Sequence, residues 1–117
     1  MSASKKIQLH VGTPQDMGQR FTSAWHRAGR GERVRETHLT FPDLPELLNA
    51  LTPKRLELLR ALHAQPAPSI RALAQRLGRD YKRVHEDVET LAASGLLDRQ
   101  PDGLRAPYDA IAAEMRL

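Results

Sequence analysis

The fold is decided by one stretch of the sequence, residues 69–97, which reads SIRALAQRLGRDYKRVHEDVETLAASGLL. Its first part has apolar residues at the i, i+3, i+4 and i+7 positions of one buried helical stripe, namely Ile70, Leu73, Ala74 and Leu77. Ser69 can cap this helix at its start, and Gly78 suits the left-handed conformation in which many helices end. The pattern therefore predicts a short helix followed by a tight turn.

A longer helix is predicted after the turn, over residues 80–94. Asp80 can cap its start, and Gly95 marks its end. We expect one face of this helix to be buried, and the residues on that face are Tyr81, Val84, Val88, Leu91 and Ala92. Residues 96–100 can form a strand, Pro101-Asp102-Gly103 is a turn signal, and residues 104–106 can pair back to complete a hairpin.

The residues before this stretch predict two more helices. Asp43 and Glu46 have the spacing of a capping box at the start of a short helix. Thr52-Pro53 starts the next helix, which runs to about Ala64. Residues 65–68, Gln-Pro-Ala-Pro, then interrupt the chain, because two prolines remove two backbone donors and disfavour helix just before them.

The N-terminal region predicts a strand, a helix and a second strand. Residues 7–11 alternate apolar and polar side chains, residues 14–28 have a helix start and an apolar face, and residues 33–41 are rich in β-branched and aromatic residues. Residues 110–117 combine a helix-favouring composition with strict strand-like alternation, so both states stay open. We favour a strand that pairs with residues 7–11 or 33–41.

The order of helix, break, short helix, glycine turn, longer helix and hairpin over residues 53–106 resembles the winged helix-turn-helix of MarR-like and ArsR-like transcriptional regulators. Residues 69–97, quoted above, carry the resemblance. It implies that the first short helix is a support for the next one, that this next helix, at about 80–94, enters DNA, and that the hairpin at about 96–107 is the wing. The first 50 residues have no counterpart in the usual forms of those families.

We therefore predict an α+β fold in two parts. Residues 1–50 are expected to form a strand-helix-strand extension with a linker helix, used for dimerisation or for binding a partner. Residues 51–117 are expected to form the winged helix-turn-helix.

Positive charge is concentrated around the predicted turn. The chain carries 18 Lys and Arg against 14 Asp and Glu, a formal net charge of +4. Within residues 71–83, five basic residues stand against one acidic residue. Clustered positive charge favours an anionic partner, and nucleic acid is the first candidate.

The start of the longer helix is the predicted DNA-reading surface, because a helix fits the major groove, where base edges present distinguishable donors and acceptors. Arg83 is the candidate for reading guanine, since its planar guanidinium can bind two acceptors at once. Lys82 and Arg79 are expected to face outward and to contact phosphates. Further along the helix, an acidic run would hold that end away from the phosphates by repulsion: Glu86, Asp87 and Glu89.

Other candidate residues lie outside that helix. Free backbone N–H groups behind the cap Ser69 can meet a phosphate, and Arg71 adds charge in the same turn. Arg99 and Arg105 flank the hairpin turn, where a wing arginine can enter the minor groove. The complete set of predicted DNA-binding residues is Ser69, Arg71, Arg79, Tyr81, Lys82, Arg83, Arg99 and Arg105.

The function predicted from these observations is a sequence-specific transcriptional regulator, a homodimeric repressor that binds double-stranded DNA. One alternative is an antitoxin that binds a co-encoded toxin protein through the N-terminal region and represses its own operon. RNA binding is a further alternative, because winged helices serve several functions. The basic residues can also be plain surface that pairs with carboxylates four residues on, as Arg83 with Asp87 or Lys82 with Glu86.

Several classes of site are not expected. The chain has no cysteine, which excludes disulfides, thiolate metal sites and cysteine nucleophiles. Its five histidines lack the H-x-x-x-H spacing of helical metal ligands, and it has no phosphate-binding glycine loop or nucleophile elbow. We therefore predict no enzyme activity, no metal and no cofactor. No apolar run approaches the ~20 residues of a membrane helix, and the N-terminus does not resemble a secretory signal, so a cytoplasmic protein is expected.

Overall fold

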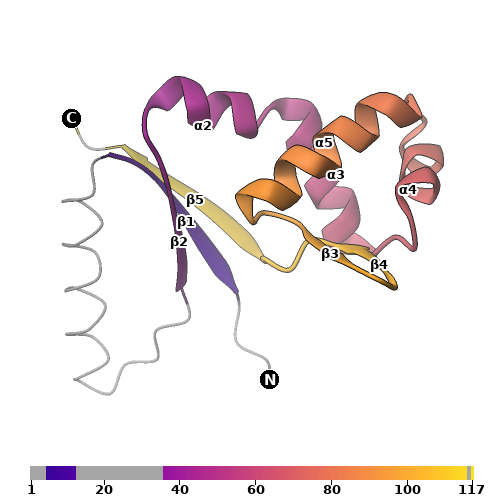
Figure 1. Cartoon of the computed structure of the whole chain (residues 1–117). Coiled ribbons are helices and arrows are strands. Elements are labelled where there is room, and N and C mark those ends of the chain that lie inside the picture. The colour runs from indigo at the N-terminus through magenta and orange to yellow at the C-terminus, as the bar shows by residue number, and fades with distance from the viewer. Residues whose placement is uncertain (1–4, 13–35, 116) are drawn as a thin grey trace, which may run out of the picture. The chain divides into compact units, whose positions relative to one another are not determined.

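A computed structural model describes residues 5–12, 36–115 and 117 (Figure 1). The described part is a mixed α+β fold, as the sequence predicts. The helix expected at 14–28 and residues 33–35 of the second expected strand lie outside the described residues. In chain order the described elements are β1 (Lys6–Val11), β2 (Glu36–Phe41), α2 (Leu44–Ala50), α3 (Pro53–Ala64), α4 (Ile70–Leu77), α5 (Tyr81–Ser94), β3 (Asp98–Gln100), β4 (Gly103–Arg105) and β5 (Ala110–Met115).

The chain divides into two units. The first unit comprises Met1–Leu47 together with Tyr108–Leu117, and the second comprises Leu48–Pro107. The division at Leu48 lies close to the boundary predicted near residue 50. The structure differs at the other end, because residues 108–117, which the sequence analysis assigned to the second part, belong to the first unit through strand β5.

Three parallel strands form the sheet of the first unit, in the order β2-β1-β5. In this register Leu9 of β1 lies between Leu39 of β2 and Ala113 of β5. Ile7 and Leu9 are buried, which agrees with the alternation that predicted this strand. The strand predicted at the C-terminal end is confirmed as β5, and its partner is β1, the first of the two candidates.

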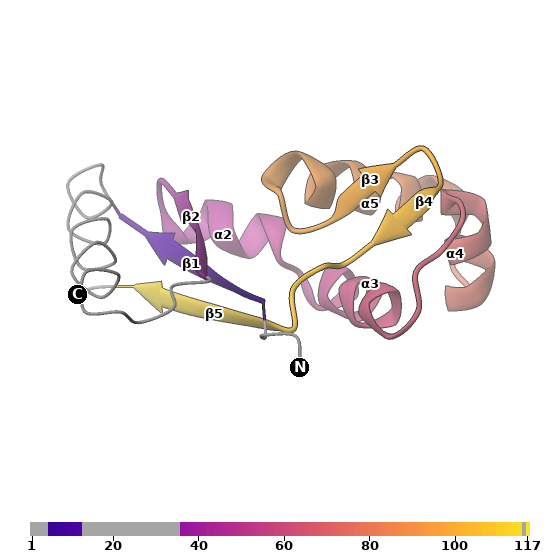
Figure 2. The ribbon, with the colours of Figure 1, turned by 90° about the horizontal axis from the view of Figure 1, so that it is seen from below.

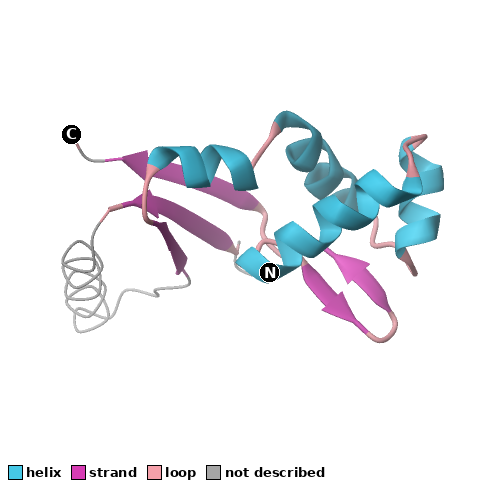
Figure 3. Ribbon diagram, turned by 45° about the horizontal axis from the view of Figure 1, so that its top comes forward, coloured by secondary structure: helices cyan, strands magenta, loops and turns pink. Residues whose placement is uncertain are grey.

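Figure 3 shows the described helices of the second unit. Helices α3, α4 and α5 each begin at a side-chain cap, as the sequence predicts. The hydroxyl of Thr52 accepts from the Arg55 N–H at 3.2 Å at the start of α3, and the hydroxyl of Ser69 accepts from the Ala72 N–H at 3.0 Å at the start of α4. The carboxylate of Asp80 accepts from the backbone N–H three residues on at 3.2 Å. Each of these bonds satisfies a donor that the helix itself leaves without a partner.

The core of the second unit is built from apolar residues of α3, α4, α5 and the hairpin. Its most deeply buried side chains are Leu58, Leu62, Leu73, Val84, Val88, Leu91 and Leu96. The apolar spacing of α5 predicts Tyr81 on the same buried face, and this prediction is wrong: Tyr81 is 47% exposed. It is the first residue of α5, so its side chain lies at the rim of the helix packing and not inside it.

The hairpin of β3 and β4 is tied to the segment that precedes α4 (Figure 2). Ala67 pairs with Leu104 in an antiparallel bridge, in which the Ala67 N–H donates to Leu104 O at 3.0 Å and the Leu104 N–H donates to Ala67 O at 2.7 Å. The guanidinium of Arg76 donates to the carbonyls of Gln65 and Pro66. The proline-rich break is therefore an ordered connection, and its pairing with the hairpin was not predicted.

Among the described helices, none combines the length and the apolar character that crossing a bilayer requires.

Gly103 supplies a test of this connection. Its φ is +147°, and a Cβ atom at this position would overlap the carbonyl oxygen of Ala67. We expect Gly103→Ala to lower the free energy of unfolding by about 3 kcal/mol, through backbone strain and loss of the Ala67–Leu104 bridge. Gly95→Ala is the matched control: its φ is also positive, but a Cβ there meets nothing within 4 Å, so it should cost about 1 kcal/mol. Urea unfolding of both variants checks this, and equal losses would contradict it.

Candidate nucleic-acid interface

A hollow of about 410 Å³ lies where the start of α4, the start of α5 and the hairpin meet. Four of the eight predicted DNA-binding residues line it: Ser69, Arg71, Tyr81 and Arg99. The remaining wall comes from Pro68, Ile70, Gln100, Gly103 and Leu104. Residues from three separate elements, including both sides of the predicted wing, therefore converge on one concave surface.

Arg71 and Tyr81 form a pair at this hollow. The Cζ atom of Arg71 lies 5.5 Å from the centroid of the Tyr81 ring, within the range of a cation–π contact. Tyr81 in turn lies against His85, with 5.9 Å between the ring centroids. Because both members of the pair are exposed, the stacked guanidinium keeps its N–H donors available to an anion.

Ser69 is occupied by its capping role, since its hydroxyl oxygen accepts from the Ala72 N–H. The first backbone N–H groups of α4 have no partner within the helix and carry its positive dipole end. Arg71 lies in that first turn. This end of α4 therefore presents backbone donors and a side-chain cation to the hollow.

Lys82 and Arg83 lie exposed on the first turn of α5. No carboxylate in the described part of the chain forms an ion pair with either side chain. The intrahelical pairs that the sequence left open, Arg83 with Asp87 and Lys82 with Glu86, are therefore not formed. Both side chains face outward, as predicted.

Arg79 does not face outward, and this prediction is wrong. Its Nη2 atom lies 2.8 Å from Oδ2 of Asp87, and its side chain is 18% exposed. Arg79 stands in the turn before α5, one residue ahead of the cap Asp80, and the turn directs its guanidinium under the helix. It belongs to the interior of the second unit and is not a candidate for phosphate contact.

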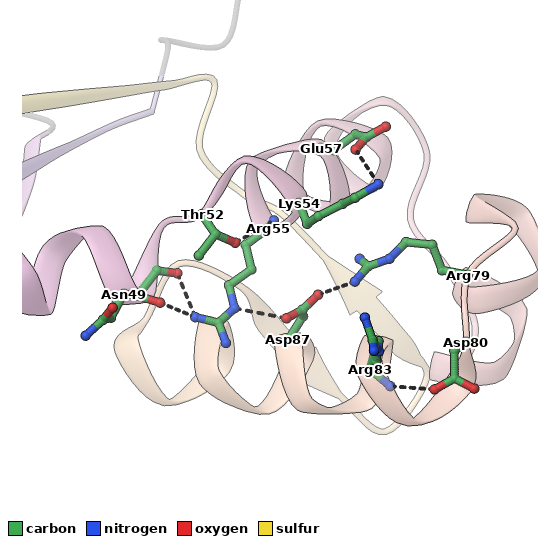
Figure 4. A network of polar contacts seen from close by, with 10 residues as sticks. Asn49, Thr52, Lys54, Arg55, Glu57, Arg79, Asp80, Arg83 and Asp87 are labelled. Atoms are coloured by element: carbon green, nitrogen blue, oxygen red, sulfur yellow. Dashed lines mark hydrogen bonds and ion pairs between the residues drawn. The ribbon is translucent and has the colours of Figure 1, made fainter.

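Asp87 lies at the centre of a polar cluster shown in Figure 4. Its Oδ1 atom accepts from Nε of Arg55 at 3.0 Å while its Oδ2 atom accepts from Arg79, and its side chain is 13% exposed. Nη1 of Arg55 also donates to the carbonyls of Asn49 and Ala50, at the last turn of α2. One carboxylate thus joins α3, the turn before α5, and α5 itself.

Asp87 was expected to face outward in an acidic run with Glu86 and Glu89, and this prediction is wrong for Asp87, which is buried. A signal was available, because positions 84, 87, 88 and 91 follow the i, i+3, i+4, i+7 spacing of a buried stripe. A carboxylate on such a stripe needs a cationic partner. The partners Arg55 and Arg79 lie 32 and 8 residues away in sequence, so they could not be identified without the fold.

The two wing arginines both have carboxylate partners. Arg99 forms an ion pair with Glu89 of α5, and Nε of Arg105 lies 3.5 Å from Oδ2 of Asp98. Arg105 does not line the hollow at Arg71 and Tyr81; it lines a second hollow of about 360 Å³, together with Pro66 and Asp102. The structure therefore separates the two arginines that the sequence placed together.

The family model described as HVO_A0114 matches residues 50–113, more than half of the 117-residue chain. The chain belongs to the HVO_A0114 family. A search of curated proteins and a search of solved structures found no match. The resemblance to MarR-like and ArsR-like regulators stays a prediction.

The segment matched by the HVO_A0114 model contains the hollow and, apart from Asn49, the Asp87 cluster, and it extends into β5. The described residues of this HVO_A0114 family member contain no group of three or more His, Cys, Asp or Glu side chains that could hold a metal ion. His10 and His38 do form a pair across β1 and β2, with 2.9 Å between Nε2 and Nδ1, which their spacing in the sequence did not indicate.

The Asp87 cluster makes a prediction about stability. Asp87→Asn keeps the size of the side chain but leaves two poorly solvated guanidinium groups without a counter-charge. We expect it to lower the free energy of unfolding by about 3 kcal/mol. Glu86→Gln removes one negative charge from the neighbouring exposed position and should change stability by less than about 0.5 kcal/mol. Chemical denaturation measures both, and similar small effects would show that the cluster is not a structural requirement.

Proposed function

We propose that residues 48–107 form a winged helix-turn-helix that binds double-stranded DNA, and that the protein regulates transcription through it. The observation that carries the proposal is the pair of exposed cations on the first turn of α5, Lys82 and Arg83. They lie next to a hollow into which the start of α4 and the hairpin also contribute. The order α3, α4, α5 and hairpin supports the same assignment.

In this proposal α5 is the recognition helix. Its back is apolar, since Val84, Val88 and Leu91 are fully buried, and its exposed N-terminal end carries the donors. A helix with this polarity can enter the major groove with its first turn foremost. Arg83 then reads guanine with its planar guanidinium, and Lys82 contacts a phosphate as a point charge.

The start of α4 and the hairpin contact the backbone in this proposal. Arg71 and the free N–H groups of α4 meet one phosphate, because a helix N-terminus favours an anion. The hairpin is the wing and contacts the backbone of the adjacent DNA strand. Arg79 makes no DNA contact in this proposal, because its guanidinium is paired with Asp87.

We further propose that the protein acts as a homodimeric repressor. A single module of this size covers limited DNA surface, and useful affinity for one site in a genome needs two half-sites. The first unit, with its parallel sheet, is the part left to provide the contact between two copies.

Two substitutions on α5 test the assigned roles. Against a duplex selected from a random pool, Arg83→Ala should cost about 1–3 kcal/mol of binding free energy and relax the preference for that sequence. Lys82→Ala should weaken binding to all duplexes alike and reduce the salt slope by about 1. Fluorescence anisotropy over a range of salt concentrations measures both quantities.

Lys54→Ala is the control for loss of a positive charge. Lys54 lies exposed on α3, pairs with Glu57 and lines neither hollow, so its removal should leave DNA affinity nearly unchanged. A flat dependence of the wild type on salt would contradict DNA binding altogether, because phosphate neutralisation releases counterions. Tighter binding to duplex RNA than to duplex DNA would assign the module to RNA instead.

A further inference from the structure

A continuous stripe of side chains runs along α5 beside the hairpin. Tyr81, His85 and Glu89 are spaced four residues apart and therefore share one helix face. Arg71 stacks on Tyr81 at one end of the stripe, and Arg99 pairs with Glu89 at the other. The two arginines that line the hollow thus differ in one respect: Arg71 rests on an aromatic ring, whereas Arg99 is held by a carboxylate.

The contact between Glu89 and Arg99 is exposed to water. Nη1 of Arg99 donates to Oε1 of Glu89, and the side chains are 45% and 50% exposed. Nε2 of His85 lies 3.8 Å from the same carboxylate oxygen. An ion pair this accessible gains little from its geometry and opens readily, because water and salt screen it.

We propose that Glu89 is an electrostatic latch on Arg99, which competes with DNA phosphate for the guanidinium and so limits the affinity of the interface. This inference rests on the proposed function of the second unit. In the free protein the carboxylate neutralises Arg99 at the wall of the hollow. On binding, a phosphate replaces Glu89, since guanidinium groups bind carboxylates and phosphates through the same pair of parallel N–H donors.

The latch explains why a carboxylate stands within a surface that otherwise attracts anions. Lys82, Arg83 and Arg71 carry no ion-pair partner among the described residues, so these three cations attract a duplex without an exchange. Arg99 contributes only after Glu89 is displaced. Part of the binding free energy is therefore spent on breaking an existing contact, and affinity stays below what the cations alone would provide.

Glu89→Gln tests the latch, because it removes the charge and keeps the shape of the side chain. Arg99 then carries an uncompensated charge before binding and engages its phosphate without displacing a carboxylate, so the duplex meets one more net positive charge. We expect affinity for a short mixed-sequence DNA duplex to rise roughly five- to tenfold near 0.1 M salt, and the log–log salt slope to steepen by about 0.9. The gain should be alike for duplexes of different sequence, because phosphates carry no sequence information.

Glu86→Gln is the matched control, since it removes the same charge from an exposed position of α5 that has no arginine partner in the described part of the chain. It reports the general effect of one negative charge fewer. A second control places Glu89→Gln in an Arg99→Gln background, where its effect should shrink to that of Glu86→Gln. Melting temperatures of all variants should stay close to that of the wild type, because the pair is exposed.

Equal effects of Glu89→Gln and Glu86→Gln would overturn the latch and leave the proposed DNA binding intact. A loss of affinity in Glu89→Gln that is confined to one sequence would also overturn it, since Glu89 would then contact a cytosine directly. Failure of the wild type and of every variant to bind duplex DNA at low salt would overturn the proposed function, and the latch with it.

Discussion

The packing of the second unit depends on one carboxylate, that of Asp87, whose side chain is largely buried. Asp87 is stable in that position only because each of its two oxygens meets a guanidinium, from Arg55 at 3.0 Å and from Arg79 at 2.8 Å. The two arginines belong to different segments, so the requirement to satisfy one charge fixes the start of α3 and the turn before α5 against the middle of α5. Arg55 extends the constraint to the last carbonyls of α2.

The same constraint decides which cations remain outside. Arg79 and Lys82 are three residues apart and of the same sign, yet only Lys82 is exposed, because Arg79 neutralises Asp87. The exposed positive charge of this region therefore comes from Lys82 and Arg83 on the first turn of α5 and from Arg71 and Arg76 on α4, without Arg79. On the hairpin, Arg99 pairs with Glu89 of α5, and Arg105 pairs with Asp98. Among the described residues, the cations at the start of α5 therefore have no ion-pair partner, whereas the arginines of the hairpin are paired with carboxylates.

Local signals predicted most of the fold. Cap residues such as Ser69 and Asp80 identified where helices begin, because an N-cap needs only its own next three residues. The contacts that the sequence did not predict join residues that are far apart along the chain. Nothing near Asp87 in sequence reveals Arg55, and nothing near Ala67 reveals Leu104. For the site, the sequence identified Lys82 and Arg83 as outward-facing cations, but it could not separate them from Arg79, whose direction is set by a tertiary partner.

The parallel pairing of β1 with β5 has a consequence for biosynthesis. More than ninety residues, including the whole second unit, separate these neighbouring strands. On the ribosome the helices of the second unit emerge and can fold while the sheet still lacks its outer strand β5. The first unit therefore closes only after residues 110–115 have left the exit tunnel, so the strand that is made first waits longest for its partner.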